Sequence, residues 1–274
     1  MRRKIIRNAK KTAFYFFLKR GIKLSDTTSS SELADFFEMV SPYRTNHELI
    51  RIGAKEDGGY LVPNDLDGIG ALFSPGIEQT ASFELILAER GIKCFMADYS
   101  IPSVPFAHPN FIFEKKFIGT EDNDVFMKMS TWVSKYDNSD NDLMLQMDIE
   151  SSEYEVLLEA DDELLRRFRI MVIEFHDLDE LFNKFGFKFI NLVFKKILKQ
   201  FEVVHIHPNN SNKPFSYLNY QGFHAMEFTF LRKDRIEKKF PEHNFPHSLD
   251  TACVANKIDY PLPVCWIGRT SRKT

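Results

Sequence analysis

From about residue 70 onward, short apolar runs alternate with stretches whose apolar residues recur at helical spacing. The apolar runs have the length and the aromatic and β-branched content of buried strands. They predict strands at residues 71–73, 93–97, 111–118, 143–147, 170–175, 201–206 and 223–231. The other stretches predict helices at residues 32–40, 80–90, 125–136, 154–168 and 178–200, the last of which would break at Gly186.

The alternation of strands and helices predicts a parallel sheet with crossover helices. No helix is evident between the sixth and seventh strands, so the last strand should return like a hairpin, antiparallel to its neighbours. We therefore predict an α/β fold with a doubly wound, seven-stranded, mostly parallel sheet and helices on both faces. In such sheets, ligands bind at the carboxyl ends of the strands.

Composition agrees with a folded protein and limits its organisation. The chain has 274 residues, 43% hydrophobic and 27% charged, an ordinary globular balance. Its length suits one full α/β domain with an extension, or two small domains. We expect a basic helical extension at residues 1–45, the main domain at 46–235, and an irregular segment at 236–274 that packs on the domain.

Positive charge is concentrated at the start of the chain. Residues 1–23 contain nine Lys or Arg and no acid, so only 27 of the 36 basic residues remain to face 39 acids. Such an acidic body argues against a nucleic-acid partner. The apolar run at residues 13–18 is far shorter than the ~20 residues of a membrane-spanning helix. Two interpretations remain: peripheral contact with an anionic membrane through a basic amphipathic helix, or a helix that packs Phe14, Phe17 and Leu18 on the domain.

The cysteines give information about the compartment. Cys94, Cys253 and Cys265 are odd in number and form no CxxC pair. This pattern favours neither a disulfide framework nor a cysteine zinc site, and it fits a reducing cytoplasm.

Asp98 ends the second predicted strand, 22 residues after Gly76. An acid at this point of a βαβ unit can bind both hydroxyls of a ribose, although it can equally cap the turn that follows. The loop at residues 74–78 has one glycine where dinucleotide-binding loops have several. A single close approach suits a ligand without a pyrophosphate, which points to an adenosine that carries a sulfonium.

Acidic and imidazole side chains follow three strands in succession. They are Asp148 and Glu150 after the fourth strand, Glu174, His176 and Asp177 at the fifth, and His205 and His207 at the sixth. The start of the antiparallel last strand, near His224, should meet the same edge. These groups can hold a divalent metal through Asp148, Glu174 and His176. They can instead supply a general base and hydrogen bonds for a polyhydroxyl substrate, or they can simply stabilise the strand ends.

Two consecutive glycines precede the first predicted strand, in the segment Asp57-Gly58-Gly59-Tyr60. Glycine permits positive φ and a close backbone approach to a ligand. A plain hairpin turn is the alternative, because Asp-Gly is a strong turn signal.

Four segments together resemble the FkbM-like methyltransferase family, in the branch often found with surface-polysaccharide genes. They are DGGY at residues 57–60, DIESSEY at 148–154, EFHDL at 174–178 and HIHPNN at 205–210. The resemblance covers roughly residues 48–232, and DIExxEY and EFHDL are its most specific parts. It implies a class I methyltransferase fold with S-adenosylmethionine as the methyl donor.

The resemblance also implies roles for individual residues. Gly76 and its loop would approach the methionine part of the donor, Asp98 would hold the ribose, and Asp148 would sit beside the transferred methyl. The full cofactor-binding set is then Gly59, Tyr60, Ser74, Gly76, Asp98, Tyr99 and Asp148, and the catalytic set is Asp148, Glu174 and His176. Two positions depart from the family: Ser151 replaces a usual glycine, and Pro75 replaces a small residue.

The expected function is transfer of a methyl group to a hydroxyl of a sugar, on a nucleotide sugar or a surface-polysaccharide precursor. A sugar hydroxyl is a weak nucleophile at neutral pH, so it needs a base such as His176 or a divalent metal (Mg²⁺, Mn²⁺ or Fe²⁺) that lowers its pKa. The alternative is a non-catalytic S-adenosylmethionine-binding or scaffold protein on the same fold. A Rossmann oxidoreductase fits poorly, because the GxGxxG motif is missing.

Overall fold

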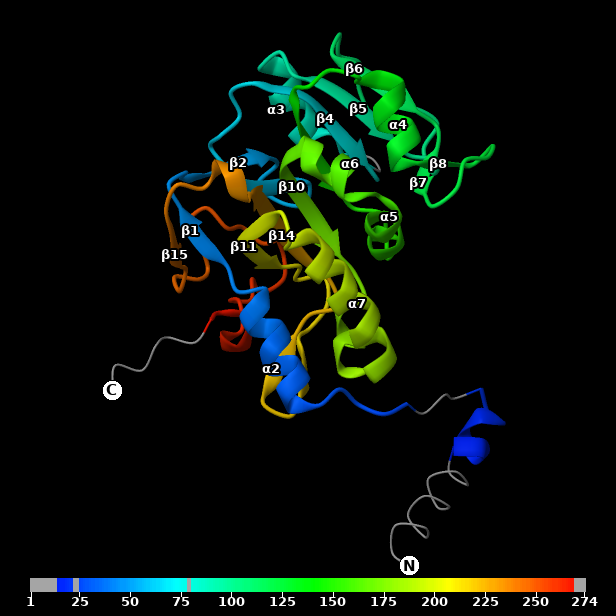
Figure 1. Cartoon of the computed structure of the whole chain (residues 1–274), viewed down its shortest axis with the longest axis vertical. Coiled ribbons are helices and arrows are strands. Elements are labelled where there is room, and N and C mark those ends of the chain that lie inside the picture. Colours follow the sequence, from blue (N-terminus) through cyan, green and yellow to red (C-terminus); the bar gives the residue numbers. More distant parts are fainter. Residues whose placement is uncertain (1–13, 22–24, 78–79, 269–274) are drawn as a thin grey trace, which may run out of the picture.

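The computed structural model describes residues 14–21, 25–77 and 80–268. A seven-stranded sheet runs through its centre, and Figure 1 shows helices packed along it. From one edge to the other the strands are β6 (Phe111–Glu114), β5 (Lys93–Ala97), β4 (Ile69–Pro75), β9 (Asp142–Met147), β10 (Phe168–Phe175), β14 (Met226–Arg232) and β11 (Phe201–Pro208). All neighbours are parallel except β14, which is antiparallel to both β10 and β11.

Numbered along the chain, the strands lie in the order 3-2-1-4-5-7-6. This order, with an antiparallel seventh strand, is that of the class I methyltransferase fold. The predicted fold class is therefore confirmed, including the direction of the last strand. The strand order reverses between β4 and β9, so a ligand crevice is expected where these two strands end.

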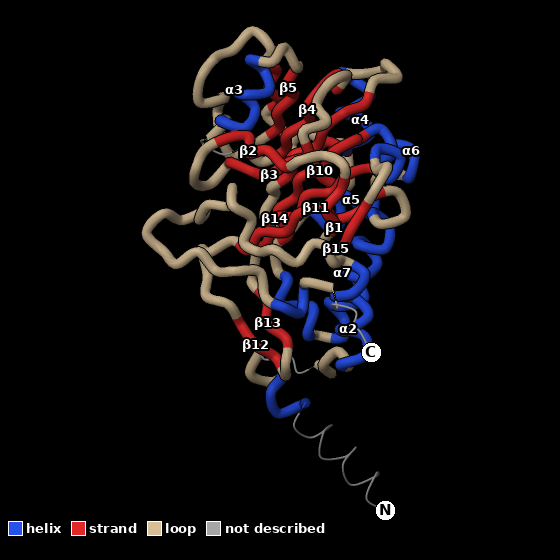
Figure 2. Tube along the Cα trace, turned by 90° about the vertical axis from the view of Figure 1, so that its left-hand side faces the viewer, coloured by secondary structure: helices blue, strands red, loops and turns tan. Residues whose placement is uncertain are grey.

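Side chains alternate between two apolar layers, one on each face of the sheet. Phe73 of β4 enters the larger layer and the adjacent Leu72 enters the smaller one, as the two-residue period of a strand requires. The larger layer is covered by α2 (Ser30–Met39), α4 (Met129–Tyr136), α5 (Glu153–Glu159), α6 (Asp162–Arg167) and α7 (Lys184–Ile197). The smaller layer lies beneath α3 (Ser82–Glu89) and the hairpin of β2 (Leu49–Gly53) and β3 (Gly59–Pro63). Figure 2 shows this hairpin next to α3.

Three predicted elements are divided in the structure. The third strand ends at Glu114, and the chain then forms β7 (Phe117–Gly119), which pairs with β8 (Phe126–Lys128) outside the main sheet. The helix expected from residue 125 consequently begins only at Met129. The helix at 154–168 breaks at Ala160, and the Asp161 side chain caps a new helix.

The break in the helix predicted at residues 178–200 lies at Asn183 and not at Gly186. A 3₁₀-helix, η1 (Leu178–Phe182), precedes it, and the Asn183 side chain then accepts a hydrogen bond from the N–H of Phe185 at the start of α7. This capping bond satisfies a helix N–H that would otherwise lack a partner. Gly186 lies inside the first turn of α7 and does not interrupt it.

Short strands and turns complete the structure. They are β1 (Tyr43–Thr45) paired with β15 (Lys239–Pro241), the hairpin of β12 (Phe215–Tyr217) and β13 (Tyr220–Gly222), and two 3₁₀-helices, η2 (Lys233–Arg235) and η3 (Val264–Trp266). β15 is a strand within the segment expected to be irregular. Trp266 of the same segment is buried against Phe37 of α2.

Residues 14–18 are helical and, with the turn to residue 21, lie away from the sheet in both views (Figures 1 and 2). Leu18, one of the residues expected to pack on the domain, is 46% exposed, and Tyr15 and Phe16 are about half exposed. Residues 1–13, which carry six of the nine basic residues found at positions 1–23, lie outside the described residues. Among the described helices, none combines the length and apolar character needed to span a bilayer.

Candidate functional site

The loop at residues 148–152 connects the end of β9 to α5 at the carboxyl edge of the sheet. Glu150 and Ser151 adopt left-handed conformations, with φ of 52° and 80°. Non-glycine residues pay for this conformation, typically about 1–2 kcal/mol each. Glycine adopts positive φ without this cost, so Ser151 holds a conformation in which glycine would be unstrained. A strained loop at this edge directs its side chains toward the ends of the neighbouring strands.

The imidazole of His176, just after β10, lies among four carboxyl groups. Its Nδ1 is 3.2 Å from Oε1 of Glu153. Its Nε2 is 3.8 Å from Oδ1 of Asp148, 3.6 Å from Oε2 of Glu150 and 3.7 Å from Oε1 of Glu174. With Nδ1–H donating to Glu153, the neutral ring has Nε2 as its free proton acceptor.

The first turn of α5 fixes this imidazole. The Tyr154 hydroxyl donates a 2.6 Å hydrogen bond to the carbonyl oxygen of His176. Oε1 of Glu153, a residue with no exposed surface, also accepts the N–H of Ile149 at 3.0 Å. Glu153 therefore joins the strained loop to the histidine. Within the DIExxEY segment nothing distinguishes Glu153 as a site residue, because an acid at the start of a helix is an ordinary feature.

The buried carboxyl groups have raised pKa values. Burial raises the pKa of Asp148 to about 8, opposed by the charge of His176 and reinforced by those of Glu153 and Glu150. Burial also raises the pKa of Glu174 well above its usual range, with the charge of Asp148 adding to it. Burial would lower the pKa of His176, but its hydrogen bond to Glu153 and the charges of Glu153, Asp148 and Glu150 outweigh this and raise it to about 9. The centre thus retains protons at neutral pH that a bound cation would displace.

Three carboxylate oxygens at this edge are buried without a hydrogen-bond partner among the described residues: Oδ1 of Asp148, Oε2 of Glu153 and Oε2 of Glu174. An unsatisfied buried polar group costs about 1–3 kcal/mol, and more when charged. A positively charged ligand beside Asp148 would offset this cost.

A cavity of about 380 Å³ opens beside the ends of β4, β5 and β9. Asp98 and Ser100 line one part of it, and the rings of Phe117 and Phe126 line another, together with Ile118. Oδ1 of Asp98 accepts hydrogen bonds from the N–H and hydroxyl of Ser100 at 2.7 and 2.6 Å. Asp98 therefore holds the turn after β5 and also faces the cavity, so both sequence interpretations describe contacts it can make.

A smaller cavity of about 40 Å³ lies on the other side of the β4–β9 junction. Asp57, Thr80 and Glu84 contribute polar groups to its lining. Gly76 and Asp148 line both cavities. A ligand could therefore extend from Asp98, past Asp148, to Asp57.

Gly76 is required by its neighbours. Its φ is 81°, and a Cβ at this position would lie 1.6 Å from the carbonyl oxygen of Asp148. The glycine expected to approach a methionine thus first permits the ends of β4 and β9 to meet. The hairpin turn behaves similarly, because a Cβ on Gly59 would lie 1.9 Å from the carbonyl oxygen of Ala54.

The other predicted cofactor-binding residues occupy different depths. The Tyr60 hydroxyl lies 3.3 Å from Nε2 of Gln146, and Tyr60 lines the small cavity. Ser74 is fully buried, with its hydroxyl in contact with Glu84 and 2.6 Å from Oε1 of Gln146. Tyr99 is 39% exposed, and its ring centroid is 5.4 Å from that of Phe117.

The histidines of β11 do not join the His176 centre. His205 lies 2.8 Å from Oδ1 of Asp250, and Nε2 of His207 lies 3.3 Å from Oδ1 of Asp259. Both acids belong to the chain after residue 236, which covers this part of the sheet. The expected single edge of acids and imidazoles is therefore divided, with Asn209 as the link, since its Nδ2 donates to Oε1 of Glu174 at 2.7 Å.

His224 lies before β14 on the side facing η1. Its Nδ1 is 2.9 Å from Oδ1 of Asp179, and its Nε2 is 3.5 Å from Oδ1 of Asp177. It lines a third cavity of about 560 Å³ with Asp179 and with the rings of Phe182 and Tyr217. Asp177, which directly follows His176, has φ of 53°.

The candidate metal ligands differ from the predicted set. Asp148, Glu153 and His176 offer ligand atoms that lie within 4.8 Å of one another. Glu153 thus takes the place expected for Glu174, although Glu174 also approaches the histidine. The Oε1 of Glu153 already accepts two hydrogen bonds, which commits it to holding His176 and the loop.

Comparisons with known proteins leave the fold as the firm result. A scan of protein-family models finds no match to this chain, and a search of curated proteins finds none. Among solved structures, one match is a crystal structure from Pyrococcus horikoshii described as a "putative RNA methyltransferase". It is 12% identical, with a TM-score of 0.31, and the match covers 61% of this chain and 76% of that one. The strand order, and not this distant likeness, establishes the fold.

Proposed function

We propose that this chain is an S-adenosylmethionine-dependent O-methyltransferase whose acceptor is a sugar hydroxyl and whose general base is His176. The observation that carries the proposal is the position of Asp148. It lines both cavities at the β4–β9 junction, and its carboxylate lies 3.8 Å from His176. A donor bound along these cavities would have its reactive centre next to the base.

The two cavities suit the two ends of the donor. Phe117, Ile118 and Phe126 offer apolar surfaces for an adenine, and Asp98 offers a carboxylate to the ribose hydroxyls. At the other end, Asp57 and Glu84 can face the α-ammonium group. Oδ1 of Asp148, which accepts no hydrogen bond from the described residues, lies between them and matches the positive sulfonium. The acids therefore complement the two positive charges of the donor, on its sulfonium and its α-ammonium group.

The chemistry required of the protein is alignment and proton removal. S-adenosylmethionine supplies a methyl group already activated by the sulfonium. His176 accepts the acceptor's hydroxyl proton at Nε2 as the O–C bond forms and the C–S bond breaks, and Glu153 stabilises the resulting imidazolium. Alignment and base catalysis together can contribute several kcal/mol to the rate.

A sugar acceptor is supported by the third cavity and by the sequence. Aromatic rings of Phe182 and Tyr217 can cover the C–H face of a pyranose, and Asp179 can accept hydrogen bonds from its hydroxyls. The cavity is next to Asp177, the residue after His176. The DIExxEY and EFHDL segments add the resemblance to FkbM-like methyltransferases. A nucleotide sugar or a surface-polysaccharide precursor would fit this chemistry.

Binding of S-adenosylmethionine by calorimetry, with NAD as comparison, tests the donor. We expect Asp98→Ala to weaken this binding by about 10- to 100-fold, the loss of about 1.5–3 kcal/mol that hydrogen bonds to a charged group contribute. Asp98→Asn keeps an oxygen for Ser100 and should lose less. Equal affinity in all three proteins would assign Asp98 to the turn alone, and a wild type that binds no S-adenosylmethionine would refute the function.

A divalent metal held by Asp148, Glu174 and His176 is the second way to activate the hydroxyl, favoured by the unpartnered oxygens of the two acids. Adding metal ions back after exhaustive chelation distinguishes activation by a metal from base catalysis by His176. Because the neutral form of His176 can accept the hydroxyl proton at Nε2 without a metal, we expect that adding Mg²⁺, Mn²⁺ or Fe²⁺ separately will not raise the rate. A rate that depends on one of these ions would assign the metal to this centre.

The non-catalytic alternative is a protein that binds S-adenosylmethionine without transferring its methyl group. A screen of nucleotide sugars for methyl transfer distinguishes the two functions. Binding of the donor with no transfer to any sugar, lipid-linked or free, would favour the scaffold.

A further inference from the structure

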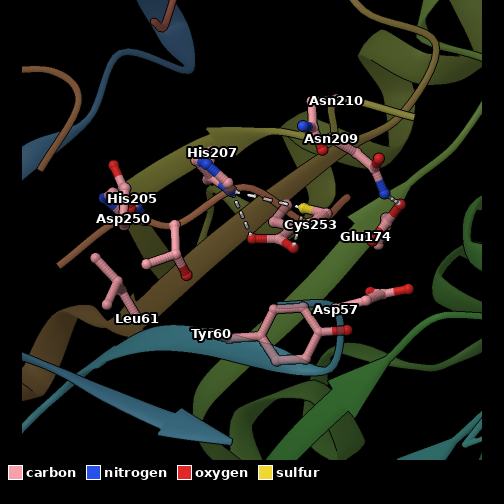
Figure 3. A network of polar contacts seen from close by, with 12 residues as sticks. Asp57, Tyr60, Leu61, Glu174, His205, His207, Asn209, Asn210, Asp250 and Cys253 are labelled. Atoms are coloured by element: carbon pink, nitrogen blue, oxygen red, sulfur yellow. Dashed lines mark hydrogen bonds and ion pairs between the residues drawn. The ribbon is translucent and has the colours of Figure 1, made fainter. Parts of the chain in front are cut away.

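A second cluster of potential ligands lies beyond the His176 centre, between the sheet, the β2–β3 hairpin and the C-terminal segment. His207 of β11 and Glu227 of β14 are direct cross-strand partners, and Cys253 reaches them from the segment after β15. All three residues are at least 93% buried. Figure 3 shows His207 and Cys253 directed toward one another above Asp57 and Tyr60.

The geometry points to a Zn²⁺ ion held by His207, Glu227 and Cys253, and we propose this site as a metal clip for the C-terminal segment. Nδ1 of His207 lies 3.1 Å from Oε2 of Glu227, and Sγ of Cys253 lies 3.3 Å from Oε1 of Glu227 and 3.9 Å from Nδ1 of His207. Usual zinc bond lengths at tetrahedral angles place such ligand atoms about 3.3–3.6 Å apart. The observed separations, which reach two different oxygens of Glu227, lie within about 0.4 Å of these values, and one ligand atom from each residue lies within 4.8 Å of the other two.

The surroundings hold two of the ligands in place. Oδ1 of Asp259 lies 3.3 Å from Nε2 of His207, the carboxylate–histidine arrangement that orients metal-bound imidazoles. The side chain of Asn210, 1% exposed, accepts from the N–H of Val254 at 2.8 Å and donates to its carbonyl oxygen at 3.0 Å. This clamp fixes the backbone next to Cys253. Contacts with residues outside the cluster therefore hold His207 and Cys253 in position.

The types of ligand favour zinc, and the charges of the ligands balance the charge of the ion. A thiolate, an imidazole and a carboxylate together suit Zn²⁺ better than Mg²⁺ or Ca²⁺. Zn²⁺ would replace two protons, the thiol proton of Cys253 and the proton between His207 and Glu227, both released to solvent. The buried cluster remains neutral, because thiolate and carboxylate offset the two charges of the ion. The fourth position is left for a water molecule.

Such a clip would act on the cofactor side of the molecule. The carbonyl oxygen of Cys253 accepts the N–H of Asp57 at 3.2 Å, and Asp57 lines the small cavity. The ion would therefore secure the segment that supports the hairpin turn. The sequence gives no sign of it, because the three ligands are far apart in the chain and the single cysteine forms no CxxC pair.

Cobalt substitution of the full-length protein tests the clip directly. After chelation, added Co²⁺ should give one tightly bound ion with a thiolate-to-cobalt charge-transfer band. Cys253→Ser should abolish the band. Cys265→Ser, whose hydroxyl can keep the 3.2 Å contact to the carbonyl oxygen of Gln221, should retain it. No band in the folded wild type, or a band that persists in Cys253→Ser, would overturn the proposal.

A milder variant covers the case in which Cys253→Ser does not fold. Asp259→Asn changes a partly exposed residue whose carboxylate lies 3.3 Å from the outer nitrogen of His207. It should weaken Zn²⁺ affinity by about 10- to 100-fold, the usual effect of losing such a partner. Unchanged affinity in folded Asp259→Asn would contradict the assignment of His207 as a ligand. Because no described sulfur reaches the His176 centre, the band is independent of methyl transfer and of any metal there.

Discussion

Replacing His176 with glutamine is expected to lower kcat for methyl transfer by about 100- to 10,000-fold, the usual contribution of a positioned general base. Glutamine can still donate a hydrogen bond to Glu153, but it cannot accept the proton of the acceptor hydroxyl. Binding of S-adenosylmethionine should change little, because the imidazole lies beside the donor site and not in it. Rapid-quench measurement of a single turnover gives the chemical step directly.

The pH dependence of the wild type identifies the base. His176 accepts a proton only when neutral, and its surroundings raise its pKa to about 9 in the free protein. Below this value most of the imidazole is protonated, so kcat/KM should rise with pH and level off above about 9. Bound S-adenosylmethionine brings positive charge that disfavours the imidazolium. The midpoint in kcat, which reports the bound complex, should therefore lie at lower pH than the midpoint in kcat/KM.

His108→Gln is the control for this variant. His108 precedes β6 at the amino edge of the sheet, where its ring contacts the N–H of Asn110. It should leave both the rate and the pH profile unchanged. If His176→Gln kept the wild-type kcat and its rise with pH, another group would be the base.

The sequence predicted the central sheet because each strand is a local apolar run that ends in polar residues. Asp98 directly follows β5 and Asp148 directly follows β9. This position in the sequence is enough to bring both acids to the carboxyl edge of the sheet. The ends of the helices were predicted less accurately. Asn183 and Asp161 cap new helices inside stretches of continuous helical spacing, and a capping side chain has only a weak signal within such a stretch.

The site was predicted in part, for a related reason. His176 and Asp148 come from adjacent strands, so the strand order brings them together. Glu153 was missed, since its role depends on the left-handed turn at Glu150 and Ser151. His207 was placed with the wrong neighbours, because the segment that covers it lies more than 40 residues further along the chain. Long-range contacts of irregular segments have no periodic pattern from which they could be predicted.

Gly76→Ala is expected to have the largest effect on stability of the substitutions considered. Its φ of 81° is strained for alanine, at about 1–2 kcal/mol. The new Cβ would also lie 1.6 Å from the carbonyl oxygen of Asp148. Relieving that contact must separate β4 from β9, at a further cost of about 1–3 kcal/mol as in other overpacked sites. We expect the free energy of unfolding to fall by about 2–5 kcal/mol.

Gly91→Ala separates the two contributions. Gly91 has a similar φ of 86° after α3, but a Cβ there meets no atom within 4 Å. It should lose only the conformational part, about 1–2 kcal/mol, and should bind S-adenosylmethionine normally. Gly76→Ala should bind it at least about 100-fold more weakly, because the displaced backbone carries Asp148, the residue shared by both cavities. Denaturant unfolding and calorimetry on the pair measure both effects. If the two variants lost equal stability and bound the donor equally well, the meeting of β4 and β9 at Gly76 would have no role in holding the site.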